Sequence, residues 1–164
     1  MPRSLLRKTP LFGAMSDEQL DKILAQCEKS HFEAGDVVLT EGEEGREMYI
    51  VEQGQVEISK AISVQIPGRG KVSFEKQLVV LGEGTYFGEV ALLAKDNRSA
   101  TVTARTPLDV WVLDSASMQR LMDQDLDLSY KLLSVMSREL CKRLTAANED
   151  IRKLMTAFTI AINR

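Results

Sequence analysis

Hydrophobic residues recur at about every second position between His31 and Leu113, and glycine or proline interrupts this pattern every few residues. A period of two is typical of β-strands, and the interruptions are typical of tight turns. Short strands at such even spacing predict a sandwich or a barrel. The predicted strands are 37–40, 48–51, 55–59, 77–81, 99–104 and 109–113, with 67–70 as the tip of a longer hairpin.

The segments on either side of this β-rich region have a helical period. A short amphipathic helix is predicted within residues 9–28, with Ser16 as its N-cap. After a cap-like Asp114, a first helix is predicted to end near Met122 and a second to begin near Asp127. The chain therefore divides into an N-terminal helical segment, a β domain and a pair of C-terminal helices, with bounds 1–30, 31–114 and 115–164.

Apolar residues in the last helix step alternately by four and three, which is the a/d seam of a coiled coil. The seam residues are Leu140, Leu144, Ala147, Ile151, Leu154, Phe158 and Ala161. This pattern predicts a parallel homodimer through the C-terminal helix. The alternative is a long helix packed on its own barrel, which is less favourable because one barrel can hardly cover a helix that projects so far.

The composition is that of an ordinary soluble globular domain, with 44% hydrophobic and 27% charged residues and a net charge of −3. Lysine and arginine are scattered among acidic residues, which argues against nucleic-acid binding by this chain. No apolar stretch reaches the length of a membrane span, and the N-terminus does not resemble a signal peptide, so we expect a cytoplasmic location. Cys27 and Cys141 match no metal or disulfide spacing and are expected to be buried or half-buried thiols.

The stretch FGEVALLAKDNRSATV, residues 87–102, has features of an anion site. Gly88 allows the backbone to approach a ligand, and a helical turn beginning at Glu89 would present free N–H groups to a phosphate. Arg98 adds a permanent cation that can form paired hydrogen bonds with phosphate oxygens. The small residues Ser99 and Ala100 leave room for a phosphate ester at the backbone.

Glu89 is a poor phosphate ligand, because like charges repel. Its carboxylate can instead accept a hydrogen bond from a hydroxyl beside the phosphate, such as a ribose 2′-hydroxyl. Spacing alone leaves a second interpretation open, in which Glu89 and Arg98 form a surface ion pair.

The same stretch resembles the phosphate-binding cassette of the cyclic nucleotide-binding domain family. The segment FEAGDVVLTEGEEGREMYIVEQGQVEI, residues 32–58, is similar to the glycine-punctuated signature of that family. The resemblance covers about residues 10–150 and implies a mainly β fold: an antiparallel, jelly-roll-like β-roll with an N-terminal helix and a long C-terminal dimerisation helix. It also places three glycines at turns of the barrel, where we expect a structural role: Gly42, Gly45 and Gly54.

The resemblance implies a role for each cassette residue. Glu89 would accept a hydrogen bond from the ribose 2′-hydroxyl, Arg98 would pair with the cyclic phosphate, and Ser99 would add a side-chain contact. The complete set of predicted ligand-binding residues is Phe87, Gly88, Glu89, Val90, Ala91, Arg98, Ser99, Ala100, Arg143 and Asn148.

The identity of the base depends on residues that vary within the family. Ala100 stands where cyclic-GMP-selective eukaryotic members tend to carry threonine, which favours cyclic AMP over cyclic GMP. The C-terminal helices resemble those of the bacterial catabolite activator branch, in which Arg143 matches an arginine that can approach the cassette glutamate. We therefore expect Arg143 to contact Glu89, with a solvated Arg143 as the alternative. Asn148 can pair with adenine, but Ala147 offers nothing polar.

These features predict a non-enzymatic sensor that binds cyclic AMP or cyclic GMP without a metal and signals occupancy to an unknown downstream partner. The winged-helix DNA-binding domain of the catabolite activator branch is not found before Arg164, so no DNA binding by this chain is expected, nor any membrane partner. Two cysteines and one histidine argue against an iron–sulfur site. A nucleotide-independent dimerisation or protein-interaction module, and the sensory fragment of a longer regulator, remain as alternatives.

Overall fold

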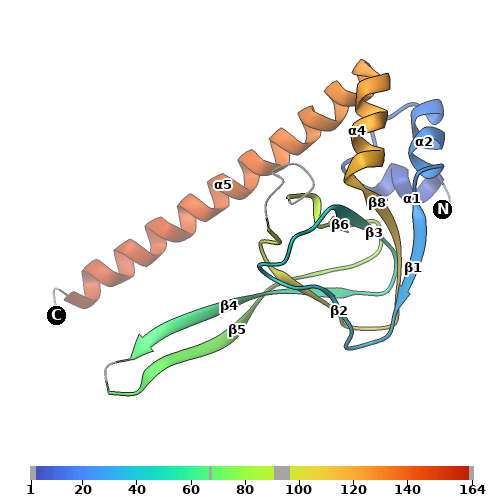
Figure 1. Ribbon diagram of the computed structural model, residues 1–164. Helices are drawn as coiled ribbons and strands as arrows, with labels where there is room; N and C mark the ends of the chain where they lie inside the picture. The colour runs from blue at the N-terminus through green and yellow to red at the C-terminus, as the bar shows by residue number, and fades with distance from the viewer. Residues whose placement is uncertain (1–2, 67, 91–96, 163–164) are drawn as a thin grey trace.

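The computed structural model describes residues 3–66, 68–90 and 97–162 as a β-roll with helices on one side (Figure 1). Two short helices, α1 and α2, precede the roll, and α4 and α5 follow it. The elements are α1 Arg3–Lys8, α2 Asp17–Leu24, β1 Glu28–Phe32, β2 Val37–Leu39, β3 Glu47–Gln53, β4 Val56–Ile66, β5 Gly70–Leu81, β6 Tyr86–Phe87, β7 Thr101–Ala104, β8 Leu108–Asp114, α4 Ser115–Gln124 and α5 Leu126–Ile162.

The strands form two four-stranded sheets, with the orders β1-β8-β3-β6 and β2-β7-β4-β5. Every pairing between these strands is antiparallel. The predicted mainly β fold with flanking helices is confirmed. Two strands were not predicted: β1, which is largely polar, and β6, which has only two residues.

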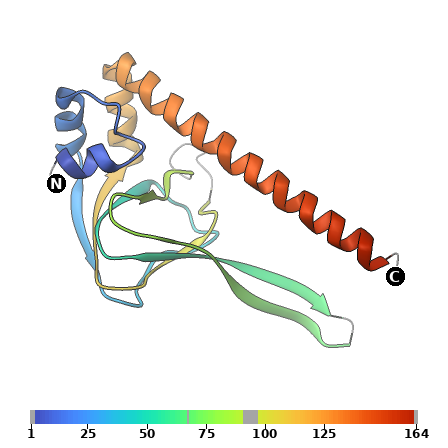
Figure 2. The ribbon, with the colours of Figure 1, turned by 180° about the vertical axis from the view of Figure 1, so that it is seen from behind.

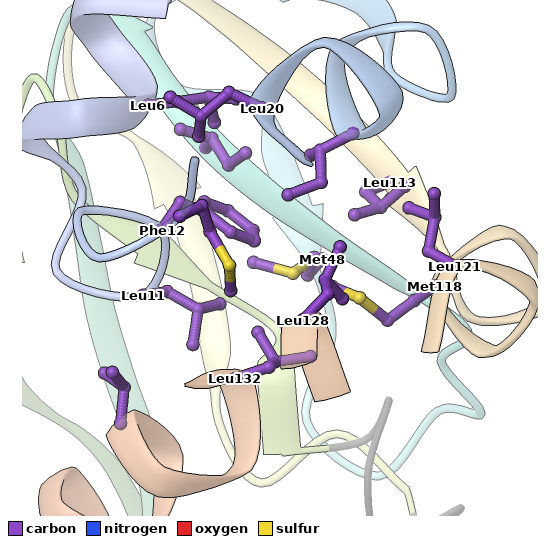
Figure 3. Close-up of a cluster of buried hydrophobic side chains, with 14 of the residues drawn as sticks. Leu6, Leu11, Phe12, Leu20, Met48, Leu113, Met118, Leu121, Leu128 and Leu132 are labelled. Atoms are coloured by element: carbon purple, nitrogen blue, oxygen red, sulfur yellow. The ribbon is translucent and has the colours of Figure 1, made fainter. Parts of the chain in front are cut away.

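Two hydrophobic clusters hold the helices and the sheets together. One lies inside the roll and contains Val51, Val56, Phe87 and Val110. The other joins the helices to the outside of the β3–β8 sheet, where Phe12, Met48, Leu113 and Leu128 converge with their neighbours (Figure 3). The second cluster fixes the first turns of α5 against the roll, because Leu128, Leu132, Val135 and Met136 are all buried in it.

The helix starts follow the predicted capping residues. Ser16 caps α2 and forms a capping box with Gln19, in which each side chain bonds to the other residue's backbone N–H. Asp114 caps α4 through hydrogen bonds of 2.9 Å from the N–H groups of Ala116 and Ser117. These caps satisfy donors that the first turn of a helix otherwise leaves unpaired.

The β4–β5 hairpin and α5 both extend beyond the roll on the same side of the molecule (Figures 1 and 2). The hairpin pairs from Val56↔Leu81 to Ile66↔Gly70, so its tip lies at the predicted position, although Pro67 is outside the described residues. From Leu140 to Ile162 every side chain of α5 is exposed.

The cysteine prediction is correct for one residue and wrong for the other. Cys27 is partly buried after α2, whereas Cys141 is exposed on α5. Among residues 3–66, 68–90 and 97–162, no helix has the length and apolar character needed to cross a membrane. The same part of the chain has no group of three or more His, Cys, Asp or Glu side chains placed to hold a metal ion.

Candidate functional site

The backbone turns sharply at Gly88, directly after β6. Its φ is 84°, a conformation that side-chain-bearing residues rarely adopt. A Cβ atom at this position would also come within 2.9 Å of both the Arg98 Nη1 atom and the Glu47 carbonyl oxygen. Gly88 is therefore needed for its conformation and for the close packing of Arg98.

Arg98 lies almost entirely inside the protein, with 6% of its surface exposed. Its Nη1 donates hydrogen bonds to the carbonyl oxygens of Glu47, at 2.8 Å, and Gly88, at 3.1 Å. Its Nη2 lies 3.2 Å from the Glu47 carboxylate. These contacts compensate the cost of burying the guanidinium and hold it in one orientation.

The Arg98 side chain packs directly against the backbone of Gly45. A Cβ atom at Gly45 would lie 1.9 Å from Arg98 Nε and 2.2 Å from its Cζ, distances that no real structure tolerates. Gly45 does not have a positive φ, so turn geometry alone does not require a glycine there. The role of Gly45 is structural, as expected, but it comes from packing: the missing side chain makes room for the guanidinium of Arg98.

Glu89 is also buried, with 8% of its surface exposed. The Nη1 atom of Arg143 on α5 donates a 2.7 Å hydrogen bond to Glu89 Oε1. The predicted contact between Arg143 and Glu89 is confirmed. The alternative of a surface ion pair between Glu89 and Arg98 is wrong, because both residues are buried and each pairs with a different residue.

These residues border a cavity of about 520 Å³ between the roll and α5. This volume lies within the range of small-molecule sites, roughly 300–1,000 Å³. The predicted site residues that line it are Phe87, Gly88, Glu89, Val90, Arg98, Ser99, Ala100 and Arg143. Asn148 is exposed farther along α5 and is not among the lining residues, and Ala91 lies outside the described residues.

The remaining walls of the cavity are mostly apolar, and sequence reasoning missed them. They include Leu39, Ile58, Leu81 and Val102 from four strands of one sheet. Lys60 adds a cation to Arg98 and Arg143, and its Nζ bonds to the Ser99 carbonyl oxygen at 3.2 Å. Strand alternation indicated that such residues point inward, but it did not indicate that they face a cavity.

The arrangement suits an anionic ligand with a flat or apolar part. Arg98 can neutralise a phosphate, Glu89 can accept a hydrogen bond from a hydroxyl, and the apolar walls can cover a ring. Tyr49 on β3 and Phe87 on β6 stack with ring centroids 5.1 Å apart, which fixes the strand that leads into Gly88. Burial raises the pKa of Tyr49 still farther above neutral pH, so its phenol stays uncharged there.

Comparison with known proteins decides the family. The family profile of the cyclic nucleotide-binding domain matches residues 29–125, which is more than half of the chain. The chain belongs to the cyclic nucleotide-binding domain family. The matched segment contains almost all of the roll and the whole cassette stretch, residues 87–102.

Two relatives of this domain are regulatory subunits of a protein kinase. The chain is 33% identical over 125 residues to the cAMP-dependent protein kinase regulatory subunit of Schizosaccharomyces pombe, covering 76% of this chain and 27% of the relative. It is 38% identical over 117 residues to the corresponding subunit of Eremothecium gossypii, covering 71% and 23%. The chain thus spans about a quarter of the length of these relatives.

A solved structure resembles most of this chain. The N-terminal domain of a transcriptional regulator from Streptomyces coelicolor A3(2) superposes with a TM-score of 0.73 and 29% identity, covering 87% of this chain and 94% of that domain. The likeness extends beyond the residues matched by the family profile, because 87% of the chain exceeds the span of residues 29–125.

Proposed function

We propose that this domain binds cyclic AMP in the cavity between the roll and α5. The observation that carries the proposal is the burial of Arg98 and Glu89 in the wall of one cavity of suitable volume. Arg98 would pair with the cyclic phosphate, together with Ser99 and the backbone at Gly88 and Ala100. Glu89 would accept the hydrogen bond of the ribose 2′-hydroxyl. Cyclic GMP is the second ligand to test, with Ala100 favouring cyclic AMP.

We infer that occupancy of the cavity is passed to α5 through Arg143. The Arg143 side chain holds Oε1 of Glu89, so a ribose hydroxyl bound to the same carboxylate would change the position in which Arg143 and α5 are most stable. Glu89 and Arg143 also line a second, smaller cavity of about 270 Å³ beneath α5, whose other walls include Met136 and Leu140. This space gives α5 room to move against the roll when ligand binds.

We also propose that α5 pairs with α5 of a second copy of the chain. The seam from Leu140 to Ala161 is exposed along its whole length, and an isolated helix with an apolar stripe in water is unfavourable. Such a homodimer would report ligand occupancy to a downstream protein, and Asn148 on α5 would contact the base in one of its two cavities. The same exposed seam supports the second candidate, a dimerisation module that does not need nucleotide.

Calorimetric titration of the full chain with cyclic AMP and cyclic GMP tests the binding proposal. Replacement Arg98→Ala removes charge-assisted hydrogen bonds worth about 1.5–3 kcal/mol each, so affinity should fall by at least about tenfold. Arg105→Ala is the matched control, because this substitution also removes a guanidinium group. Arg105 is exposed directly after β7 and does not line the cavity. Its affinity should stay unchanged.

The two candidates give different results in this experiment. Binding of either nucleotide, lost selectively in Arg98→Ala, supports the sensor. No heat at millimolar concentrations of both nucleotides, together with an unchanged melting temperature, contradicts it and favours the nucleotide-independent module. A ligand present at 100 times its dissociation constant should add about 2.7 kcal/mol to stability, which a melting curve detects.

A further inference from the structure

Lys60 lies at the edge of the cavity, on the part of β4 that leads out to the hairpin tip. It lines the cavity together with Ile58, which is two residues nearer the roll. Half of the Lys60 side chain is exposed, whereas Arg98, the cation assigned to the phosphate, is buried. The two cations therefore lie in different surroundings, and the contacts proposed for phosphate and ribose give Lys60 no role.

Contacts within the chain hold the ammonium group of Lys60 in place. Its Nζ lies 3.2 Å from the Ser99 carbonyl oxygen and 3.4 Å from Glu41 Oε1. Glu41 is itself fixed, because its Oε2 accepts a 3.0 Å hydrogen bond from the N–H of Ala61 and its own N–H donates one of 3.1 Å to Thr101 Oγ1. An ammonium group has three N–H donors. Within residues 3–66, 68–90 and 97–162, two acceptors lie beside this one, which leaves one donor for a ligand.

The bond to the Ser99 carbonyl places Lys60 away from the phosphate. The peptide bond between Ser99 and Ala100 is trans, so its C=O and N–H groups point in opposite directions. The proposed phosphate contact uses the N–H of Ala100, whereas Lys60 bonds to the carbonyl oxygen on the other side of this peptide. Lys60 is therefore poorly placed to neutralise the phosphate, a role that the proposed function gives to Arg98.

The base must occupy the part of the cavity that phosphate and ribose leave open. Most of the other described residues that line the cavity are apolar: Leu39, Ile58, Leu78, Val79, Leu81 and Val102. These side chains can cover the faces of a flat ring, but they cannot form hydrogen bonds with its edge. Two of the remaining described lining residues are polar, Lys60 and Tyr86. Tyr86 also lines the smaller cavity beneath α5 together with Glu89, which places it on the ribose side. Lys60 is therefore the side chain available to the edge of the base.

We propose that Lys60 donates a hydrogen bond to the edge of the purine base and raises the affinity for guanine relative to adenine. This inference rests on the nucleotide binding proposed above. Guanine presents two acceptors on this edge, O6 and N7, whereas adenine presents the N7 acceptor beside an N6 donor. An ammonium group only donates, so it matches the guanine edge better. Ala100 favours cyclic AMP, and Lys60 thus acts on the selectivity in the opposite direction.

Calorimetric titration with three cyclic nucleotides tests the proposal. Cyclic IMP has the carbonyl of guanine at position 6 but lacks the 2-amino group, so it isolates the acceptor that Lys60 would contact. Lys60→Met removes the ammonium group and keeps an unbranched apolar stem. The dissociation constants of cyclic GMP and of cyclic IMP, each divided by that of cyclic AMP, should rise about fivefold or more in Lys60→Met.

Lys76→Met is the matched control. Lys76 lies directly opposite Lys60 in the β4–β5 ladder and is exposed, but it is not among the residues that line the cavity. The control removes the same charge from the same face of the hairpin, so a general effect of charge would appear in both variants. Its two ratios should change less than about twofold, because exposed charges are screened by salt. Lys60→Arg should keep the wild-type ratios, since a guanidinium also donates to O6 and N7.

Several results would overturn the inference. An equal loss of affinity for all three nucleotides in Lys60→Met would show that Lys60 acts on the phosphate and not on the base. Unchanged ratios in Lys60→Met, or ratios that change as much in Lys76→Met, would also refute the base contact. A change for cyclic GMP without one for cyclic IMP would assign the selectivity to the 2-amino group. Failure of the proposed function looks different, because a wild-type chain that binds none of the three nucleotides refutes nucleotide binding and this inference together.

Discussion

Gly45→Ala should weaken nucleotide binding although Gly45 is not a predicted ligand. The new Cβ would stand 1.9 Å from Arg98 Nε, so the guanidinium must shift by more than 1 Å to regain an ordinary contact of about 3.4 Å. The shift would misalign the charge-assisted hydrogen bonds between Arg98 and the phosphate, each worth about 1.5–3 kcal/mol. Loss of one such bond lowers the affinity for cyclic AMP by about 10- to 150-fold.

Calorimetric titration measures this loss, and Gly42→Ala is the control. Gly42 belongs to the same loop and has a φ of 86°, but a Cβ there meets no atom within 4 Å. Gly42→Ala should therefore lower stability by about 1–2 kcal/mol and leave affinity unchanged. If Gly45→Ala binds as tightly as wild type, or if Gly42→Ala loses as much affinity, the proposed packing of Arg98 on Gly45 is not what governs binding.

Two further predictions concern stability and reactivity. Hydrogen bonds from Ser117, and then from the Ala116 backbone, lower the pKa of Asp114. Asp114→Ala should therefore lower the free energy of unfolding in urea by about 1 kcal/mol at pH 7. The difference in unfolding free energy between wild type and Asp114→Ala should narrow as the pH falls below about 4, because the carboxylate is then protonated in wild type. Asp114→Asn should keep most of the stabilisation by the cap. Burial raises the pKa of Cys27 to about 12, whereas Cys141 is exposed. Iodoacetamide at pH 8 should modify Cys141 and spare Cys27 until urea is added; equal rates in the native protein would contradict this.

The contact between Arg143 and Glu89 is a long-range contact that the sequence resemblance predicted correctly. The two residues are 54 positions apart, and nothing in the local pattern of either one indicates the other. The prediction came from matching two separate motifs to one family. The structure adds that Glu89 is buried while the Arg143 side chain is about half exposed, so this ion pair closes the cavity at its surface.

The site residues that sequence reasoning missed are those without a local signal. Glu47 holds Arg98 through both its backbone and its carboxylate, yet in the sequence it is one of several acidic residues in an acidic loop. Gly45 looks like any turn glycine beside Gly42. The structure distinguishes them: Gly42 has a positive φ, whereas Gly45 makes room for Arg98, and such a close approach from a distant segment leaves no periodic pattern in the sequence.

The sequence by itself determined the succession of elements and the identity of the cassette. Hydrophobic period and capping residues depend on neighbours within a few positions. They predicted α2, the two C-terminal helices and six of the strands, which are β2, β3, β4, β5, β7 and β8. The tertiary structure decided β1, whose pattern EKSHF is mostly polar and which forms a strand because β8 offers it a partner. It also decided which buried charges meet and which faces of α5 and the hairpin stay open. Those outcomes depend on contacts between segments that lie far apart in the sequence, and such contacts form only when the chain has folded.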